Sequence, residues 1–272
     1  MRPERDTIPA PDLPAGIEWV GDAPESMPAL TAAGPALVHF LDFAQLNSVR
    51  TLPYLAEWDD RYREQGLRTI GVQAPRFPFG AERNTVADGL RQLGVGFPVA
   101  IDADRELWHA YGCEGWPSLF LWAQGGGLAW FHFGEGEYRG TEEAIQAELR
   151  EQDALRELPD PMAPIRPTDT PNARVMAPTP EIFPGGSWER PWTAGEDGDE
   201  LEVPYEAGGA HVTVEGTGEL RFELDGFSDS IPINGPALYR LTDHPGHERH
   251  DLVLTPSSGL KIWSVSFAAG VP

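Results

Sequence analysis

This chain has a single thiol group for chemistry. Cys113 is the only cysteine among 272 residues. One thiol excludes an intrachain disulfide, a cysteine-rich zinc site and a two-cysteine redox cycle within one chain. A reactive thiol also needs positive charge or a helix N-terminus nearby, whereas Glu114 follows Cys113 directly. The sequence therefore favours a small, partly buried filler at this position over a nucleophile.

Three other residues invite a hydrolase interpretation, because their types are those of a catalytic triad. His39, Asp42 and Ser48 lie close together in the sequence. A serine nucleophile requires an oxyanion hole and a strained turn such as G-x-S-x-G, and neither motif surrounds Ser48. A polar residue at the start of a helix usually caps the helix. We therefore expect Ser48 to act as a cap and not as a nucleophile.

The densest group of possible metal ligands is the segment TDHPGHERHD at 242–251, with histidines at 244, 247 and 250. This spacing could converge on a metal only in a compact loop or helix. Pro245-Gly246 instead predicts a solvated hairpin turn between two strands. The acidic segment GEDGDE at 195–200 offers oxygen ligands for Ca²⁺ but lacks the EF-hand spacing. The sequence therefore predicts no metal site, and it calls for no cofactor.

Charge and composition exclude several classes of partner. The 20 Lys and Arg residues against 43 Asp and Glu residues give a net charge of −23. Such a chain repels phosphate groups, which makes nucleic acid and anionic membranes poor partners. No apolar run approaches the ~20 residues of a membrane helix. The N-terminal segment at 1–16 lacks the apolar core of a signal peptide. We therefore expect a soluble, cytoplasmic protein.

The elements that would position these residues alternate between strands and helices up to about residue 157. Strand-like apolar runs occur at 36–42, 67–73, 98–101, 118–123 and 128–133. Between the first two runs, Val49, Leu52, Leu55, Trp58 and Tyr62 recur at the three-to-four spacing of one helix face. Thr141 is a plausible N-cap for a last helix. This alternation predicts an α/β domain with helices on both faces of the sheet.

The composition changes beyond that domain. The segment 158–180 carries seven prolines and predicts an extended surface tether. Short alternating runs follow at 200–207, 210–216, 219–226, 236–241, 250–255 and 261–267. Clusters of Gly, Pro, Asp and Asn separate them, as in an antiparallel β-sandwich. We therefore predict a first domain over 1–157, a linker over 158–180 and a β-sandwich domain over 181–272.

Several motifs of the first domain resemble one known family. The segment at 41–58 follows a strand and opens a helix containing Pro53, and a Trp-Pro step at 116–117 opens a later strand. This order resembles the thioredoxin fold, and more narrowly the redoxin domain of the TlpA and DipZ-like families. RTLPYL at 50–55, IGVQAPRFPF at 70–79 and FHFGEGEY at 131–138 also match that family. The resemblance covers Leu13 to about Glu157 and implies a cis peptide at Pro117 bordering a substrate groove.

The redox motif itself does not match. The family carries C-x-x-C before the helix, and Gln45, Leu46, Asn47 and Ser48 stand at those positions. Thiol–disulfide exchange needs a thiolate nucleophile and a second thiol that resolves the mixed disulfide. Gln45 cannot attack sulfur and Ser48 cannot resolve a disulfide. His39 replaces the buried acid that shuttles the proton in the family.

The main interpretation is therefore a redox-inactive binding or adaptor protein that recognises an unknown protein segment or small ligand. Its expected binding residues are Phe43, Gln45, Leu46, Asn47, Ser48, Trp116 and Pro117. One alternative is a redoxin-type oxidoreductase or one-cysteine peroxidase that uses Cys113 with an external thiol.

A second alternative is a carbohydrate-binding adaptor, because the β-sandwich resembles the jelly-roll, carbohydrate-binding-like module of DipZ-like proteins. TPEIF at 179–183 and the segment 237–270 agree with the edges of that module. The aromatic residues suited to stacking on a possible glycan are Trp188, Trp192, Tyr205, Phe227, Tyr239 and Trp263. Core packing accounts for most of them equally well, and a sandwich fold does not by itself imply sugar recognition.

Overall fold

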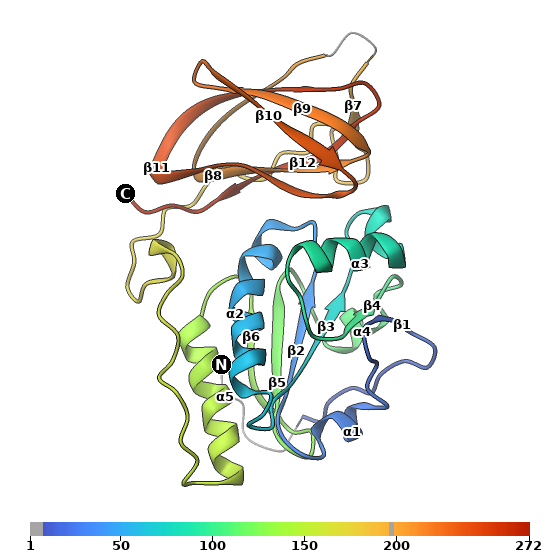
Figure 1. The fold of residues 1–272 in the computed structure, drawn as a ribbon, viewed down its shortest axis with the longest axis vertical. Helices are drawn as coiled ribbons and strands as arrows, with labels where there is room; N and C mark the ends of the chain where they lie inside the picture. Colours follow the sequence, from blue (N-terminus) through green and yellow to red (C-terminus); the bar gives the residue numbers. More distant parts are fainter. Residues whose placement is uncertain (1–7, 196–198) are drawn as a thin grey trace. The chain divides into compact units, whose positions relative to one another are not determined.

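The computed structural model of this chain describes residues 8–195 and 199–272. The chain forms two compact units, 1–163 and 164–272, which are coloured along the sequence in Figure 1. The predicted proline-rich linker 158–180 spans the division between them, which falls after Ala163.

Unit 1 is an α/β unit, as the alternation of elements predicts. Its strands are β1 (Glu18–Val20), β2 (Ala36–Leu41), β3 (Arg68–Gln73), β4 (Val99–Ile101), β5 (Ser118–Trp122) and β6 (Leu128–Phe133). Its helices are α1 (Met27–Thr31), α2 (Leu46–Tyr62), the 3₁₀ turn η1 (Pro78–Ala81), α3 (Arg83–Gln92), α4 (Glu106–Ala110) and α5 (Tyr138–Gln152). The strands form one sheet in the order β1-β4-β3-β2-β5-β6. β3 is parallel to β2 and β4, whereas β5 is antiparallel to β2 and β6.

The central strand β2 is buried along its whole length. Because successive side chains of a strand point to opposite faces, Val38 and Phe40 enter one core and His39 enters the other. The first core includes Met27 of α1 and Trp108 of α4. α2 and α5 lie side by side, joined by a 2.7 Å hydrogen bond from the Tyr62 hydroxyl to Glu142 Oε1 (Figure 1). α5 begins at Tyr138, so Thr141 lies inside that helix and the predicted N-cap there is wrong.

The proline-rich segment 158–180 is extended apart from a 3₁₀ turn, η2 (Pro167–Asp169). Its first residues are bonded to unit 1, since Gln146 Nε2 donates to the Pro159 carbonyl at 2.8 Å. The Met162 amide likewise donates to Glu142 Oε2 at 2.8 Å. Its last residues are bonded within unit 2, where the Thr179 amide donates to the Glu206 carbonyl at 2.8 Å. Each end of the segment therefore belongs to its own unit.

Unit 2 consists of antiparallel strands, and the all-β prediction is confirmed. The strands are β7 (Trp192–Thr193), β8 (Leu201–Glu215), β9 (Thr217–Leu224), β10 (Phe227–Asn234), β11 (Ala237–Pro256) and β12 (Lys261–Ala268). They form one sheet in the order β10-β9-β11-β8-β12-β7. A single core joins buried side chains from β8 to β12, among them Val212, Phe222, Ile233 and Val265, and Trp192 of β7 packs against it. Figure 1 shows β9 and β10 facing β8 and β12 across this core, as in a β-sandwich.

Two pairs of predicted strands are fused in the structure. The runs at 200–207 and 210–216 are one strand, β8, and the runs at 236–241 and 250–255 are one strand, β11. The predicted hairpin turn at Pro245-Gly246 is therefore wrong. The β8–β11 pairing shifts register between Asp243 and Glu248 instead, because the extra residues of β11 are accommodated as a bulge in a continuing ladder.

Candidate functional site

The start of α2 occupies the place of the family's redox motif. Gln45 Oε1 accepts the Ser48 amide at 2.8 Å and so caps the helix. The Ser48 side chain is fully buried, and its Oγ accepts the Asp42 amide at 3.2 Å. The cap is thus the side chain of Gln45, and the prediction that Ser48 provides it is wrong. At the two positions where the family has cysteines, the side chains of this chain form hydrogen bonds that stabilise the turn into the helix.

Asp42 ties this turn to the loop that follows β3. Its Oδ1 accepts the Ala44 amide at 2.9 Å, and its Oδ2 accepts the Arg76 amide at 2.8 Å. Burial raises the pKa of this carboxyl group, while the two amides and the charge of Arg76 act in the opposite direction. Gln73 supports the same turn, since its Oε1 accepts the Phe43 amide at 3.0 Å.

The Trp-Pro step is attached to the same loop. The Trp116–Pro117 peptide bond is cis, as the resemblance implies. Trp116 Nε1 donates to the Ala74 carbonyl at 2.9 Å. The Arg105 guanidinium donates to the Pro75 carbonyl at 2.9 Å and lies 5.3 Å from the centre of the Trp116 ring, a cation–π arrangement. Loop 74–76 therefore joins Asp42, Arg105 and Trp116 in one hydrogen-bonded surface.

The residues expected to bind a ligand differ in how much surface they offer. Phe43, Leu46, Ser48 and Pro117 are buried, whereas Gln45, Asn47 and Trp116 are partly exposed. Phe43 packs against Phe79 with ring centres 5.9 Å apart, so it lies in the interior and offers no surface to a ligand. The sequence reasoning did not identify Asp42, Gln73 and Arg105 as the side chains that organise this surface. Their partners lie about thirty residues away in the chain, and no local motif signals such contacts.

Cys113 belongs to the core of unit 1. Its side chain is 7% exposed and lies in the same cluster as Phe40 and Trp108. Burial raises the pKa of the thiol to about 12, so the thiol is protonated at neutral pH. The residue has neither the exposure nor the thiolate character of a redox nucleophile.

His39 and Ser48 do not form a catalytic pair. His39 is fully buried, and neither of its ring nitrogens has a hydrogen-bond partner among the described residues. Burial lowers the pKa of this imidazole to about 3, which leaves it neutral. A general base must reach the hydroxyl from which it takes the proton, and His39 does not bond to Ser48 or Asp42.

The described residues contain no group of three or more His, Cys, Asp or Glu side chains that could hold a metal ion. His244, in the bulge of β11, and His250, where the β8–β11 ladder has resumed, lie together but stack face to face. In the acidic segment 195–200, residues 196–198 lie outside the described residues.

Most of the candidate aromatic residues of unit 2 face inward. Tyr205 and Trp263 are buried, and Trp192 and Tyr239 are partly buried. Only Trp188 and Phe227 of this set are exposed, at 45% and 81%. Core packing therefore accounts for the two most buried rings, and a stacking platform made of all six is not present.

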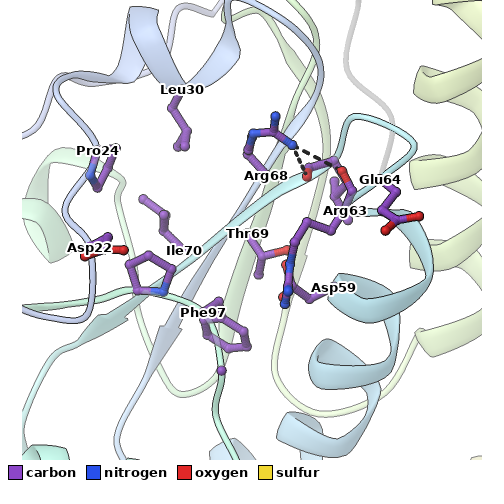
Figure 2. A pocket seen from close by; sticks show the side chains of 13 residues that line it. Asp22, Pro24, Leu30, Asp59, Arg63, Glu64, Arg68, Thr69, Ile70 and Phe97 are labelled. Carbon is purple, nitrogen blue, oxygen red and sulfur yellow. Dashed lines mark hydrogen bonds and ion pairs between the residues drawn. The ribbon is translucent and has the colours of Figure 1, made fainter.

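A cavity of about 410 Å³ lies at the other end of the sheet of unit 1 (Figure 2). Arg68 and Thr69 place it where β3 begins, whereas the start of α2 follows the end of β2. Three of its charged side chains, Asp59, Arg63 and Arg68, bond to the protein itself. Arg63 pairs with Asp59, and Arg68 donates to the carbonyls of Arg63 and Leu67. This arrangement braces the end of α2 against β3 and offers no reactive group.

Among the described residues, no helix combines the length and the apolar composition that a membrane crossing requires.

Comparison with known proteins agrees with the observed fold. No family model matches the chain. The chain is 27% identical over 299 aligned residues to the protein DipZ of Mycobacterium tuberculosis, and also to that of Mycobacterium bovis. The alignment covers 95% of this chain and 42% of each relative, so the chain spans less than half the length of these curated relatives. A shorter match, 29% identical over 72 residues, is to the thiol-disulfide oxidoreductase ResA of Bacillus subtilis. It covers 26% of this chain and 37% of that protein.

Similar solved structures include a thioredoxin-like protein in the oxidized form, which is 22% identical with a TM-score of 0.48. It covers 53% of this chain and 95% of that chain. Another is a putative thiol:disulfide interchange protein DsbE from Chlorobium tepidum, 20% identical with a TM-score of 0.46, covering 52% of this chain and 95% of that chain. The strand order of unit 1, the motifs around α2 and the alignment with DipZ along nearly the whole chain agree with one another. The chain resembles redoxins of the DipZ and TlpA type, and an antiparallel β unit follows its thioredoxin-like unit.

Proposed function

We propose that this chain is a binding or adaptor protein whose redoxin unit does not exchange disulfides. The observation that carries the proposal is that the side chains of Gln45 and Ser48 each accept a main-chain amide at the start of α2. A mixed disulfide requires a thiolate at this helix start and a second thiol beside it. Here an amide oxygen and a buried hydroxyl accept main-chain N–H groups instead.

The surface available for binding consists of the exposed parts of Gln45, Asn47 and Trp116. Hydrogen bonds from Arg105 and Trp116 hold the intervening loop 74–76 in place. A surface that is already ordered loses little conformational entropy on binding, which favours affinity. The proposed ligand is a protein segment or a small molecule that lies along this surface.

A one-cysteine peroxidase receives less support. Its nucleophile would have to be Cys113, whose thiol is buried and whose pKa is raised to about 12. Peroxidatic chemistry requires an accessible thiolate near neutral pH. The structure of this region therefore favours binding over sulfur catalysis.

Two measurements test the proposal. The purified chain is assayed for dithiothreitol-dependent reduction of insulin, and the rate is expected to equal that of a control without protein. Turnover of the thioredoxin kind would contradict the proposal directly. In the second measurement, a benzophenone amino acid at Asn47 is irradiated in cells, with the same group at Glu64 as control. Both positions offer surface, and Glu64 lies just beyond the other end of α2.

We expect a discrete adduct from position 47, absent from position 64 and lost when Trp116→Ala is added. Adducts that do not differ between positions 47 and 64, or that survive Trp116→Ala, would contradict binding at this surface. Thermal unfolding of the Trp116→Ala chain shows whether it is folded. If it is not, Asn47→Arg, tested with the benzophenone at Gln45, provides the same comparison without removing a core contact.

A further inference from the structure

The bulge of β11 brings two histidines into direct contact. The pairing of β11 with β8 shifts register between Asp243 and Glu248, and His244 lies inside this bulge. His250 lies where the ladder has resumed, opposite Tyr205. The two imidazole rings are stacked with centroids 3.6 Å apart and planes inclined by 12°.

Each ring is held by a different neighbouring element. His244 Nε2 lies 2.7 Å from the Tyr205 hydroxyl of β8. His250 Nδ1 lies 2.6 Å from Asp225 Oδ2, in the turn between β9 and β10. Asp225 also accepts the Asp251 amide at 2.9 Å and donates its own amide to the Asp251 carbonyl at 3.0 Å. The stacked pair therefore connects the bulge to this turn.

The groups around the pair define its charge. From β8, Tyr205 contacts both rings, and its other side stacks on Phe267 of β12 at 4.8 Å. From the turn comes the carboxylate of Asp225. On β11 itself, Asp243 and Glu248 act on His244 through their charges. His250 Nε2 is buried without a hydrogen-bond partner among the described residues.

These surroundings keep His244 neutral when the pair is closed. Burial raises the pKa of the Tyr205 phenol, so this hydroxyl keeps its proton and shares a hydrogen bond with His244 Nε2 at 2.7 Å. Burial and the neighbouring His250 lower the pKa of His244, while Glu248, Asp225 and Asp243 act in the opposite direction. The Asp225 carboxylate can stabilise one positive ring, His250. A second positive ring in stacking contact with the first would repel it.

We propose that His244 and His250 form a pH-responsive latch that holds the bulge 243–248 against the turn at 225–227 and releases it when both rings carry a proton. In acid, His244 takes a proton from solvent and both of its ring nitrogens then carry hydrogen, so the Tyr205 hydroxyl can only accept from Nε2 or lose that bond. The rings then separate. Phe227, which is 81% exposed, lies on the released turn, so the latch changes how unit 2 presents this aromatic side chain.

Amide hydrogen exchange of the full chain tests the latch at pH 5 and pH 7.5, with rates corrected for intrinsic pH dependence. Amides at 225–227 and 243–248 are expected to exchange at least about tenfold faster at pH 5, while β12 keeps its protection. In His244→Phe, which retains an aromatic ring but takes no proton, this difference disappears. In Asp225→Asn the release shifts to higher pH, because the carboxylate that bonds to the His250 ring in the closed pair is gone. The control His109→Gln, an exposed histidine of α4, leaves the response unchanged.

Three results would each overturn the proposal. The first is equal amide exchange at the two pH values, and the second is an unchanged pH response in His244→Phe. The third is a loss of protection at pH 5 that spreads through β12. A second readout needs no variant, because the ring resonances of the unaltered chain can be titrated by NMR. The His244 ring is expected to take its proton at a lower pH than the 6.5 of an ordinary histidine, because burial and the neighbouring His250 lower its pKa. A His244 ring that takes its proton at the ordinary pH of an imidazole would also overturn the latch.

Discussion

The two units place their buried titratable groups in contrasting surroundings. In unit 1, Asp42 is surrounded by main-chain amides, and His39 and Cys113 lie among apolar side chains. In unit 2, His244 and His250 bond to other titratable side chains, Tyr205 and Asp225. A main-chain amide does not change its charge with pH, whereas each member of the second group depends on the protonation of its neighbours. In this comparison the Asp42 carboxyl group is bonded to groups whose charge is fixed, whereas His244 and His250 are bonded to side chains that titrate themselves.

The same difference shows how a thioredoxin-like fold can be kept when the cysteines at the start of α2 are replaced. The start of α2 needs acceptors for its first amides, whatever the chemistry of the side chains that supply them. Gln45 and Ser48 supply such acceptors without sulfur. Under the proposed function, the surface around this helix start stays ordered for binding without a thiol.

The largest effect is expected for the reactivity of Cys113. Burial raises the pKa of its thiol from 9.0 to about 12, which lowers the thiolate fraction at pH 7 by about a thousandfold relative to an exposed cysteine. Iodoacetamide should therefore label the native chain far more slowly than free cysteine, and the same chain in urea should be labelled at the ordinary rate. Rapid labelling of the native chain down to pH 6, or stoichiometric oxidation to sulfenic acid, would place a reactive thiol in unit 1.

The next largest effect concerns Asp42. Asp42→Ala leaves the Ala44 and Arg76 amides without their acceptor in a buried position, at a cost of about 1–3 kcal/mol for each. We expect urea unfolding to show a loss of about 3 kcal/mol in the unfolding free energy. Asp42→Asn retains one acceptor oxygen and should lose about half as much. If Asp42→Ala were as stable as the original chain, these hydrogen bonds would not hold the loop.

His39 predicts a pH dependence of the stability of unit 1. Its pKa is about 3 in the folded state against 6.5 in the unfolded state, so the unfolded state binds more protons between these values. The unfolding free energy therefore falls as the pH decreases from 6.5 towards 3, by up to about 1.4 kcal/mol per pH unit. His39→Leu should remove this slope and leave the stability at pH 7 equal or higher, because two unsatisfied buried nitrogens are lost. Urea titrations at pH 4.5, 5.5 and 7 compare the two chains, and identical slopes would refute this role of His39.

The sequence predicts the elements of unit 1 better than the contacts that organise its site. Apolar runs and helical spacing locate the strands and α2, because burial of one face requires those patterns. Asp42, Gln73 and Arg76 meet only after β2 and β3 have paired, so no local pattern indicates their contacts.

In unit 2 the dipeptide Pro245-Gly246 is a local turn signal, yet pairing with β8 carries β11 through it as a bulge. Strand continuity is decided by the partner strand, which a local signal does not report. The two stacked histidines come together only because of this bulge, so their contact could not be foreseen from their spacing.

The smallest expected effect concerns the cap of α2, where local prediction also failed. Glutamine is not among the preferred N-cap residues, yet Gln45 Oε1 accepts the Ser48 amide at 2.8 Å. Gln45→Ala should reduce the unfolding free energy by about 1 kcal/mol, the usual value of a lost cap, and Gln45→Asp should retain most of it, since a shorter carboxylate can accept the same amide. Urea unfolding at pH 7 measures both variants. If Gln45→Ala is neutral, the helix start does not depend on this side chain, and the position would be free to change chemistry without a structural cost. A loss of about 1 kcal/mol in the unfolding free energy would instead show that Gln45, in place of the family's first cysteine, has a structural role. This role distinguishes the turn from the bulge of unit 2, for which we propose proton sensitivity.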